Sequence, residues 1–129
     1  MIVVDASVVV QALLRLPGAE AIDDRLLAAQ SVHAPHHMEL EVLQTIRRFE
    51  HRGEIAEDKG KTAVGALHDF RVNLHDSGGL LLRIWALRRN LTCYDAAYVA
   101  LAEFLAAPLL TRDRRLAAES GHNARIELV

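Results

Sequence analysis

Short apolar runs rich in β-branched residues alternate along this chain with longer segments in which apolar residues recur at helical spacing. The runs over residues 2–6, 31–36 and 107–113 predict buried strands, because a strand covered on both faces carries apolar side chains continuously. A last strand is expected over 124–129, and residues 71–79 are expected to form a short strand or a loop with a turn.

Helices are expected between these strands, over residues 7–14, 19–30, 37–53, 54–70, 80–89, 94–106 and 114–119. The long helix over 37–53 has a clear end signal, since basic residues occupy its last turns and Gly53 follows them. Strands that alternate with helices predict an α/β fold in which helices cover both faces of a parallel sheet.

The composition narrows the class of protein. The 129 residues are 51% hydrophobic, and this length suits a single domain with one core. The net charge of −2 excludes a strongly basic DNA-coating protein, so any contact with nucleic acid must come from a local patch. Cys93 is the only cysteine, which excludes an intrachain disulfide and favours a reducing cytoplasm. No apolar stretch approaches the roughly 20 residues of a membrane helix, so no membrane partner is expected.

Four carboxylates occupy positions from which they could share one site. Asp5 and Asp113 each follow an apolar run, and ligands of open α/β sheets bind beyond the carboxyl ends of the strands. Asp95 lies at the start of the helix over 94–106. Glu41 flanks the apolar stripe of the long helix, where periodicity does not separate it from Glu39.

Three of these acids also have a structural explanation as helix-capping residues. Asp5 and Asp113 could cap the helices that follow them, although Ser7 could cap the first helix equally well. Thr92 and Asp95 have the spacing of a capping box. Considered together, however, acids that share a small space repel one another and raise each other's pKa values, and a hard divalent cation such as Mg²⁺ relieves that repulsion.

Four segments, in this order along the chain, resemble the motifs of PIN-domain ribonucleases, and in particular those of the VapC-type toxins of toxin–antitoxin modules. They are MIVVDASVVV (1–10), APHHMELEVLQTIRR (34–48), LTCYDAAYVALAE (91–103) and PLLTRDRRLA (108–117). The resemblance spans essentially the whole chain. It implies a single PIN domain over residues 1–129, folded as a three-layer α/β/α sandwich around a central parallel sheet.

The resemblance also implies the residues of the site. It implies an acidic quartet that binds Mg²⁺ or Mn²⁺, made of Asp5, Glu41, Asp95 and Asp113. The glutamate of the quartet is therefore expected to be Glu41 and not Glu39. Supporting hydroxyl groups are expected from Ser7 and Thr111.

The implied activity is hydrolysis of RNA phosphodiester bonds by a metal-activated water, which leaves a 5′-phosphate and a 3′-hydroxyl. A cognate VapB-type antitoxin is expected to inhibit the enzyme, and the chain is expected to form a homodimer. Arginines near the acids could offset their repulsion of RNA or could simply lie on a solvated surface; they are Arg15, Arg112, Arg114 and Arg115.

Two other functions remain open at this point: another phosphoesterase with an acidic site, or a non-catalytic PIN-like binding module. An aspartyl-nucleophile phosphatase would need a second aspartate two residues after the first, where this chain has Ser7. It would also need a phosphate-binding lysine, yet the two lysines, Lys59 and Lys61, lie in one surface-like helix.

Several chemically suggestive side chains are expected to have structural roles. Trp85, Tyr94 and Tyr98 are expected to pack, although Tyr94 adjoins Asp95 in the sequence. Cys93 is expected in or near the core. The histidines around Pro35 are not expected to bind zinc, because no regular element would hold them on one face.

Overall fold

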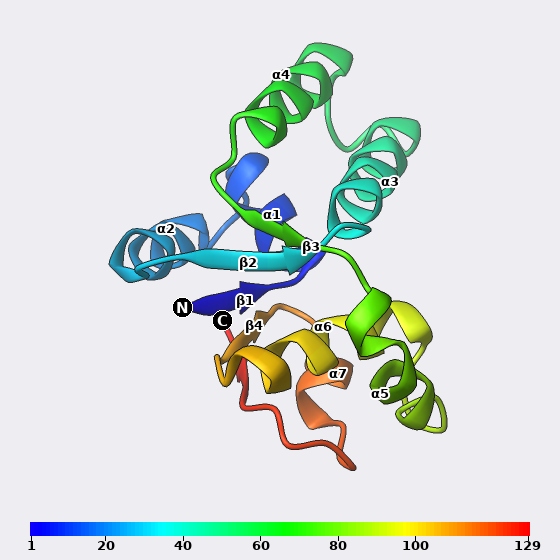
Figure 1. The fold of residues 1–129 in the computed structure, drawn as a ribbon. Helices are drawn as coiled ribbons and strands as arrows, with labels where there is room; N and C mark the ends of the chain where they lie inside the picture. The colour runs from blue at the N-terminus through cyan, green and yellow to red at the C-terminus, as the bar shows by residue number, and fades with distance from the viewer.

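A sheet of five parallel strands forms the centre of the protein, as the computed structural model of residues 1–129 shows (Figure 1). The strands are β1 (Ile2–Val4), β2 (Val32–Pro35), β3 (Asn73–His75), β4 (Leu109–Thr111) and β5 (Ile126–Leu128). Their order across the sheet is β3-β2-β1-β4-β5. Strands β2 and β3 lie on one side of β1, whereas β4 and β5 lie on its other side. The strand order therefore reverses between β1 and β4, and the carboxyl ends of these two strands form the topological switch point.

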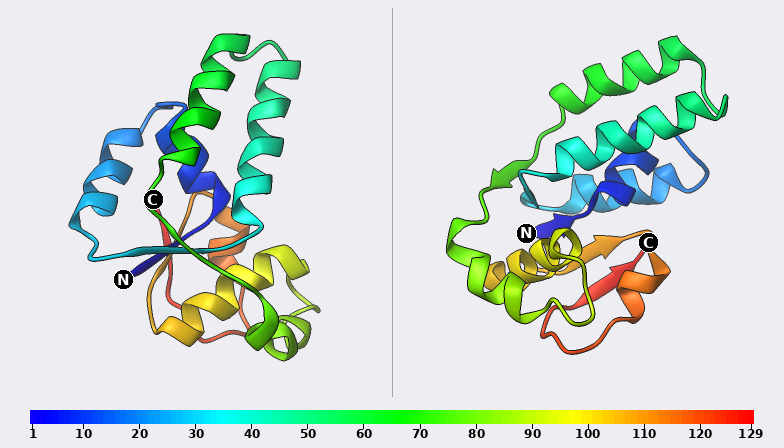
Figure 2. Two further views of the ribbon diagram at one scale, coloured as in Figure 1. Left: turned by 45° about the horizontal axis from the view of Figure 1, so that its top comes forward. Right: turned by 90° about the vertical axis from the view of Figure 1, so that its right-hand side faces the viewer.

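Helices cover both faces of this sheet. They are α1 (Ala6–Leu13), α2 (Ala19–Ala28), α3 (Met38–His51), α4 (Glu57–His68), α5 (Leu81–Ala86), α6 (Cys93–Leu105) and α7 (Arg114–Ala118), with a short 3-10 helix η1 (Gly78–Leu80) before α5. Helices α1 to α4 lie on one side of the sheet and α5 to α7 on the other (Figures 1 and 2). This three-layer α/β/α arrangement around a parallel sheet confirms the expected fold class.

The core is continuous across both faces of the central strands. Val3 and Val4 of β1 and Leu109 and Leu110 of β4 are completely buried. Helix α6 packs against β1, β2 and β4, and its alanines allow that close approach. The continuous apolar runs of the sequence thus correspond to strands buried on both faces.

The strands β1 and β4 are shorter than the apolar runs that predicted them. The run over 2–6 forms a strand only as far as Val4, and the run over 107–113 only as far as Thr111. In both cases the aspartate that follows becomes the N-cap of the next helix, which ends the extended backbone. Ser7, the alternative cap of the first helix, lies inside α1 instead.

Two aromatic residues and the cysteine depart from the packing expected of them. Trp85 and Tyr94 are 60% and 65% exposed, and Cys93 is also exposed, whereas Tyr98 is buried as expected. Helix α5 buries only Ile84, so Trp85 faces outward. Cys93 and Tyr94 belong to the first turn of α6, which becomes buried only after that turn. No helix of the structure is both long enough and apolar enough to cross a membrane.

Candidate functional site

A cavity of about 380 Å³ opens at the carboxyl edge of the sheet, between α1, α3, α6 and the segment that follows β4. Its lining includes all four acids that the sequence analysis identified, Asp5, Glu41, Asp95 and Asp113. They converge because β1 pairs with β4 in parallel, and because α3 and α6 both begin at this edge. Glu39 is exposed and does not line the cavity.

Asp5 is the most buried of the four acids, with 6% of its surface exposed. Its Oδ1 accepts hydrogen bonds from the Ser7 hydroxyl at 2.5 Å and from the Val8 N–H at 3.1 Å. Its Oδ2 accepts a hydrogen bond from the Thr111 hydroxyl. Burial raises the pKa of the Asp5 carboxyl, while these hydrogen bonds to the ionised form oppose that rise.

Ser7 and Thr111 tie Asp5 to the segment that carries Asp113. The Ser7 hydroxyl, which donates to Asp5, accepts from the Arg112 N–H at 2.8 Å. The Thr111 hydroxyl likewise accepts from the Asp113 N–H at 2.9 Å. Each hydroxyl both donates to Asp5 and accepts a backbone N–H, so the ends of β1 and β4 are linked through side chains as well as through the sheet.

Asp113 and Asp95 each begin a helix beside the cavity. Oδ1 of Asp113 accepts hydrogen bonds from the N–H groups of Arg115 and Leu116, so this residue caps α7. The Asp95 N–H donates to the Thr92 hydroxyl, as the capping-box spacing predicts. Asp113 therefore caps α7 with its own carboxylate, Thr92 caps α6, and both acids also line the cavity.

Glu41 is held by two side chains that the sequence analysis did not assign to the site. The Tyr98 hydroxyl donates to its Oε1 at 2.9 Å, and Nε2 of His37 lies 2.9 Å from the same oxygen. Tyr98 lies one helical turn after Asp95 on α6, and His37 lies one turn before Glu41. Helical spacing from these two acids was the signal that could have identified both side chains.

The charges of the acids influence one another across the cavity. The pKa of Asp95 is raised by burial and, further, by the negative charges of Glu41 and Asp113. The guanidinium of Arg115, 4.0 Å from Oδ2 of Asp95, opposes this rise. Mutual repulsion of this kind is the electrostatic condition that favours binding of a cation.

The acids suit a hard divalent cation in chemistry, although they do not form a preorganised cage. No three histidine, cysteine, aspartate or glutamate side chains stand close enough together to hold a metal ion between them. Mg²⁺ prefers oxygen ligands, keeps several of its waters and commonly binds through one or two carboxylates. The donor set of this cavity therefore fits Mg²⁺ or Mn²⁺ through a few direct ligands, and it is not a closed site.

Two arginines line the same cavity as the acids. Arg48 extends from α3, and Arg112 precedes Asp113. Nη1 of Arg112 donates to the carbonyl oxygen of Val129 at 2.7 Å, whereas Nη2 of Arg48 donates only to the Thr45 hydroxyl of its own helix. Cationic groups thus accompany the four acids.

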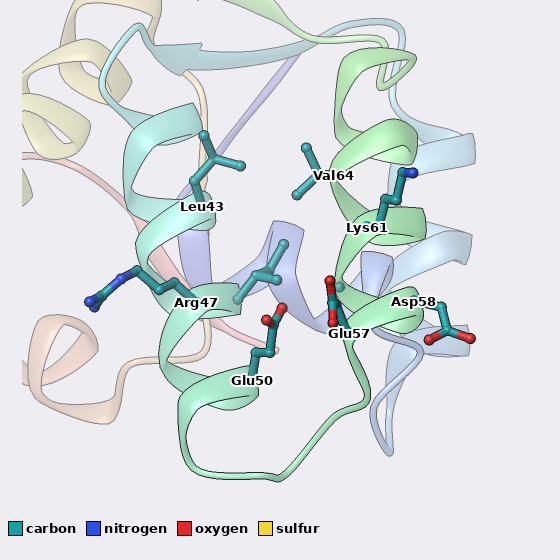
Figure 3. A pocket seen from close by; sticks show the side chains of 9 residues that line it. Leu43, Arg47, Glu50, Glu57, Asp58, Lys61 and Val64 are labelled. Carbon is teal, nitrogen blue, oxygen red and sulfur yellow. The ribbon is translucent and has the colours of Figure 1, made fainter.

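A larger cavity, of about 610 Å³, lies between α3 and α4 (Figure 3). Leu43 and Val64 face each other across it, and Glu50, Glu57 and Lys61 stand nearby (Figure 3). Both acidic and basic residues line this groove, and none of the four acids of the quartet is among them. Its volume alone does not make it the candidate site.

The histidines near Pro35 separate into different environments. Nδ1 of His33 lies 2.8 Å from Nε2 of His75 on β3, and Nε2 of His33 lies 2.8 Å from the Ser31 hydroxyl. His37 instead turns toward Glu41. These side chains thus have separate hydrogen-bonding partners on neighbouring elements.

Comparison with known proteins gives the family context of this site. Residues 2–119 match the family model described as PIN domain. The chain is 42% identical over 129 residues to "Ribonuclease VapC12" of Mycobacterium tuberculosis, and the match covers 100% of this chain and 99% of that protein. The match therefore includes every residue that lines the acidic cavity.

Solved structures share the fold at lower sequence identity. PAE2754 from Pyrobaculum aerophilum superposes with a TM-score of 0.69 at 24% identity, covering 96% of this chain and 81% of that one. A "Toxin-antitoxin complex from Klebsiella pneumoniae" contains a chain with a TM-score of 0.63 at 18% identity, covering 94% of this chain and 93% of that one. Both support the observed topology.

Proposed function

Because this chain belongs to the PIN-domain family and, within it, to the VapC-type ribonuclease toxins, we propose that it is a metal-dependent endoribonuclease of a toxin–antitoxin system. One observation carries the proposal: acids from four separate segments of the chain line a single cavity at the switch point of the sheet. Ligands of open α/β sheets bind at this position.

The acidic quartet would hold Mg²⁺ or Mn²⁺, with one or two direct ligands from among Asp5, Asp95 and Asp113 and the remaining acids reached through waters of the ion. When bound, such an ion lowers the pKa of a coordinated water and polarises the phosphoryl oxygen of the substrate. Glu41, whose Oε1 is held by Tyr98, would orient the attacking water or contribute to a second ion site. In-line hydrolysis would break the bond from phosphorus to the 3′ oxygen and leave a 5′-phosphate and a 3′-hydroxyl.

The substrate in this proposal is single-stranded or looped RNA. Four carboxylates repel a polyanion, so the protein must supply positive charge next to them. Arg48 and Arg112 line the same cavity and are suited to the phosphates that flank the scissile bond. Arg112 was among the candidate arginines of the sequence, and Arg48 is an addition to them.

The partners in this proposal are a VapB-type antitoxin and a second copy of the chain, in a reducing cytoplasm. The structurally similar chain from Klebsiella pneumoniae comes from a toxin–antitoxin complex, which supports the antitoxin. Several large apolar side chains are exposed and available to partner chains, among them Leu40, Leu82 and Trp85 at 69%, 88% and 60%.

A cleavage assay with defined RNAs and Mg²⁺ tests the proposal, together with growth on induced expression and mapping of the RNA ends. We expect growth arrest and new 5′-phosphate ends. Hydrolysis of simple phosphate esters without RNA cleavage would instead indicate another phosphoesterase. Metal binding without cleavage of any RNA would indicate a non-catalytic binding module.

A further inference from the structure

Glu41 is fixed from two sides through a single oxygen atom. Oε1 accepts a hydrogen bond from the Tyr98 hydroxyl at 2.9 Å, and the same oxygen lies 2.9 Å from Nε2 of His37. Neither of these donors is bound to Oε2. The Glu41 side chain is 36% exposed and lines the acidic cavity, so its second oxygen remains available to a ligand there.

The orientation of His37 is itself well defined. Nε2 also lies 3.2 Å from the carbonyl oxygen of Tyr94, and both of its neighbours are acceptors only. Nε2 must therefore carry a hydrogen. The imidazole contacts the rings of Tyr94 and Tyr98 edge-on, with centroid distances of 5.5 Å and 5.0 Å. These contacts restrict its rotation, so it remains directed at Glu41.

Tyr98 is suited to holding Glu41, because its own position is fixed. Its side chain is 1% exposed, so its ring position is determined by the core and not by solvent. Burial and the negative charge of Glu41 raise the pKa of the Tyr98 hydroxyl. A carboxylate oxygen only accepts hydrogen bonds, so the Tyr98 hydroxyl is the donor in this contact.

We infer that Tyr98, with His37 as a second donor, is a positioning residue that holds Oε1 of Glu41 and leaves Oε2 directed to the reacting groups. This inference rests on the proposed ribonuclease function and deepens it. A free glutamate has three rotatable side-chain bonds, and ordering them in advance removes an entropic cost from the reaction. We call the contacts of Tyr98 and His37 with Glu41 the clamp. Because Tyr98 belongs to α6 and Glu41 to α3, the clamp also fixes the position of Glu41 relative to Asp95 of α6.

The test compares Tyr98→Phe with Tyr94→Phe in the full chain. Both changes remove one hydroxyl from α6 and keep the ring, but the hydroxyl of Tyr94 is on a side chain that is 65% exposed and makes no hydrogen bond to Glu41. For Tyr98→Phe we expect kcat on RNA to fall about tenfold with KM unchanged, because a hydrogen bond to a charged group is lost. For Tyr94→Phe we expect the wild-type kcat.

A double-mutant cycle separates positioning from general structural support. If Tyr98 acts through Glu41, then Tyr98→Phe has no further effect on the residual kcat of Glu41→Gln. If the two substitutions instead lower kcat independently, so that the double variant shows the product of the two losses, the inference is wrong. The carboxyl ¹³C NMR signal of Glu41, assigned by its loss in Glu41→Gln, should move in metal-free Tyr98→Phe and stay in place in Tyr94→Phe.

The outcomes distinguish this inference from the proposed function. If the wild-type protein cleaves RNA and Tyr98→Phe matches it in kcat, the inference is wrong and the function stands. If the wild-type protein cleaves no RNA, the proposed function is wrong. If the NMR signal of Glu41 also does not move in Tyr98→Phe, the inference about the clamp is wrong as well. If Tyr98→Phe does not fold, the other donor is tested instead. His37→Ala removes that donor, and we expect kcat to fall. His37→Gln restores an N–H at this position, and we expect kcat to recover.

Discussion

The hydroxyl of Thr111 donates a hydrogen bond to Oδ2 of Asp5, although 106 positions separate the two residues in the sequence. Thr111 is completely buried and Asp5 is 6% exposed, so water has little access to either group. The same hydroxyl accepts from the N–H of Asp113 at 2.9 Å. Thr111 therefore links two acids of the quartet through one buried atom.

Replacing this hydroxyl should destabilise the protein. Thr111→Val keeps the shape of the side chain but leaves Oδ2 of Asp5 and the N–H of Asp113 without this partner, which costs about 1–3 kcal/mol in the free energy of unfolding. Urea unfolding measures the change. Thr111→Ser retains the hydroxyl and serves as the control. A valine variant as stable as the wild type would show that the hydrogen bond contributes nothing.

The stability of the metal-free protein should fall as the pH rises from acid to neutral through the ionisation of Asp5 and Asp95. Burial raises the pKa of both, and Glu41 and Asp113 raise that of Asp95 further. A carboxyl whose folded-state pKa is raised stabilises the fold below its unfolded pKa of about 3.9, and that contribution is lost as the pH passes the raised pKa.

Mg²⁺ should counter this loss at neutral pH. We expect Mg²⁺ to raise the thermal unfolding midpoint more at about pH 7.5 than at about pH 4.5, because only ionised carboxylates bind the ion. Asp95→Asn should reduce the response. An equal shift at both pH values would contradict a carboxylate site.

Asp5→Asn should abolish RNA cleavage and leave the fold intact. The change removes a proposed metal ligand, and an ion of this kind contributes several kcal/mol, so the loss should exceed about 100-fold. Circular dichroism would verify the fold, and cleavage of a labelled RNA would measure activity. Glu39→Gln, at an exposed position outside the cavity, is the matched control. Wild-type activity in purified Asp5→Asn would refute the role of Asp5.

Chelation should stop RNA cleavage reversibly. We expect EDTA to remove activity and excess Mg²⁺ or Mn²⁺ to restore it, because the acidic cavity offers the oxygen ligands that both ions accept. EDTA saturated with Mg²⁺ beforehand controls for effects of the chelator itself. Undiminished cleavage in EDTA would exclude the metal mechanism.

Arg48→Ala should weaken RNA binding more than it slows the reaction. Arg48 lines the acidic cavity, whereas its neighbour Arg47 lines the groove between α3 and α4. We expect KM to rise about tenfold for Arg48→Ala, as for the loss of a charged hydrogen bond to phosphate, and to change little for Arg47→Ala. Steady-state kinetics on a short RNA would measure both. Equal effects from the two variants would indicate nonspecific charge attraction.

The sequence predicted the elements and the shared sheet edge of Asp5 and Asp113, because both depend on local pattern. Continuous apolar runs identified the buried strands, and an acid within two residues of the end of β1 or β4 must lie at the sheet edge where parallel strands end. Periodicity alone did not choose Glu41 over Glu39, and the choice came from the family resemblance. Likewise, Trp85 was expected to pack, yet only one residue of the short helix α5 is buried.

By itself, then, the sequence determined that a parallel α/β sheet would bring Asp5 and Asp113 to one edge. Only the tertiary structure decided that the Thr111 hydroxyl links Asp5 to the N–H of Asp113 and that the Ser7 hydroxyl links Asp5 to the N–H of Arg112. It alone also decided that Tyr98 and His37 hold Glu41 and that Arg48 lines the same cavity. The physical reason is the distance along the chain over which each effect acts. Hydrophobic period and capping act over a few neighbouring residues, whereas these contacts depend on how separate helices pack against the sheet, which no short stretch of sequence specifies.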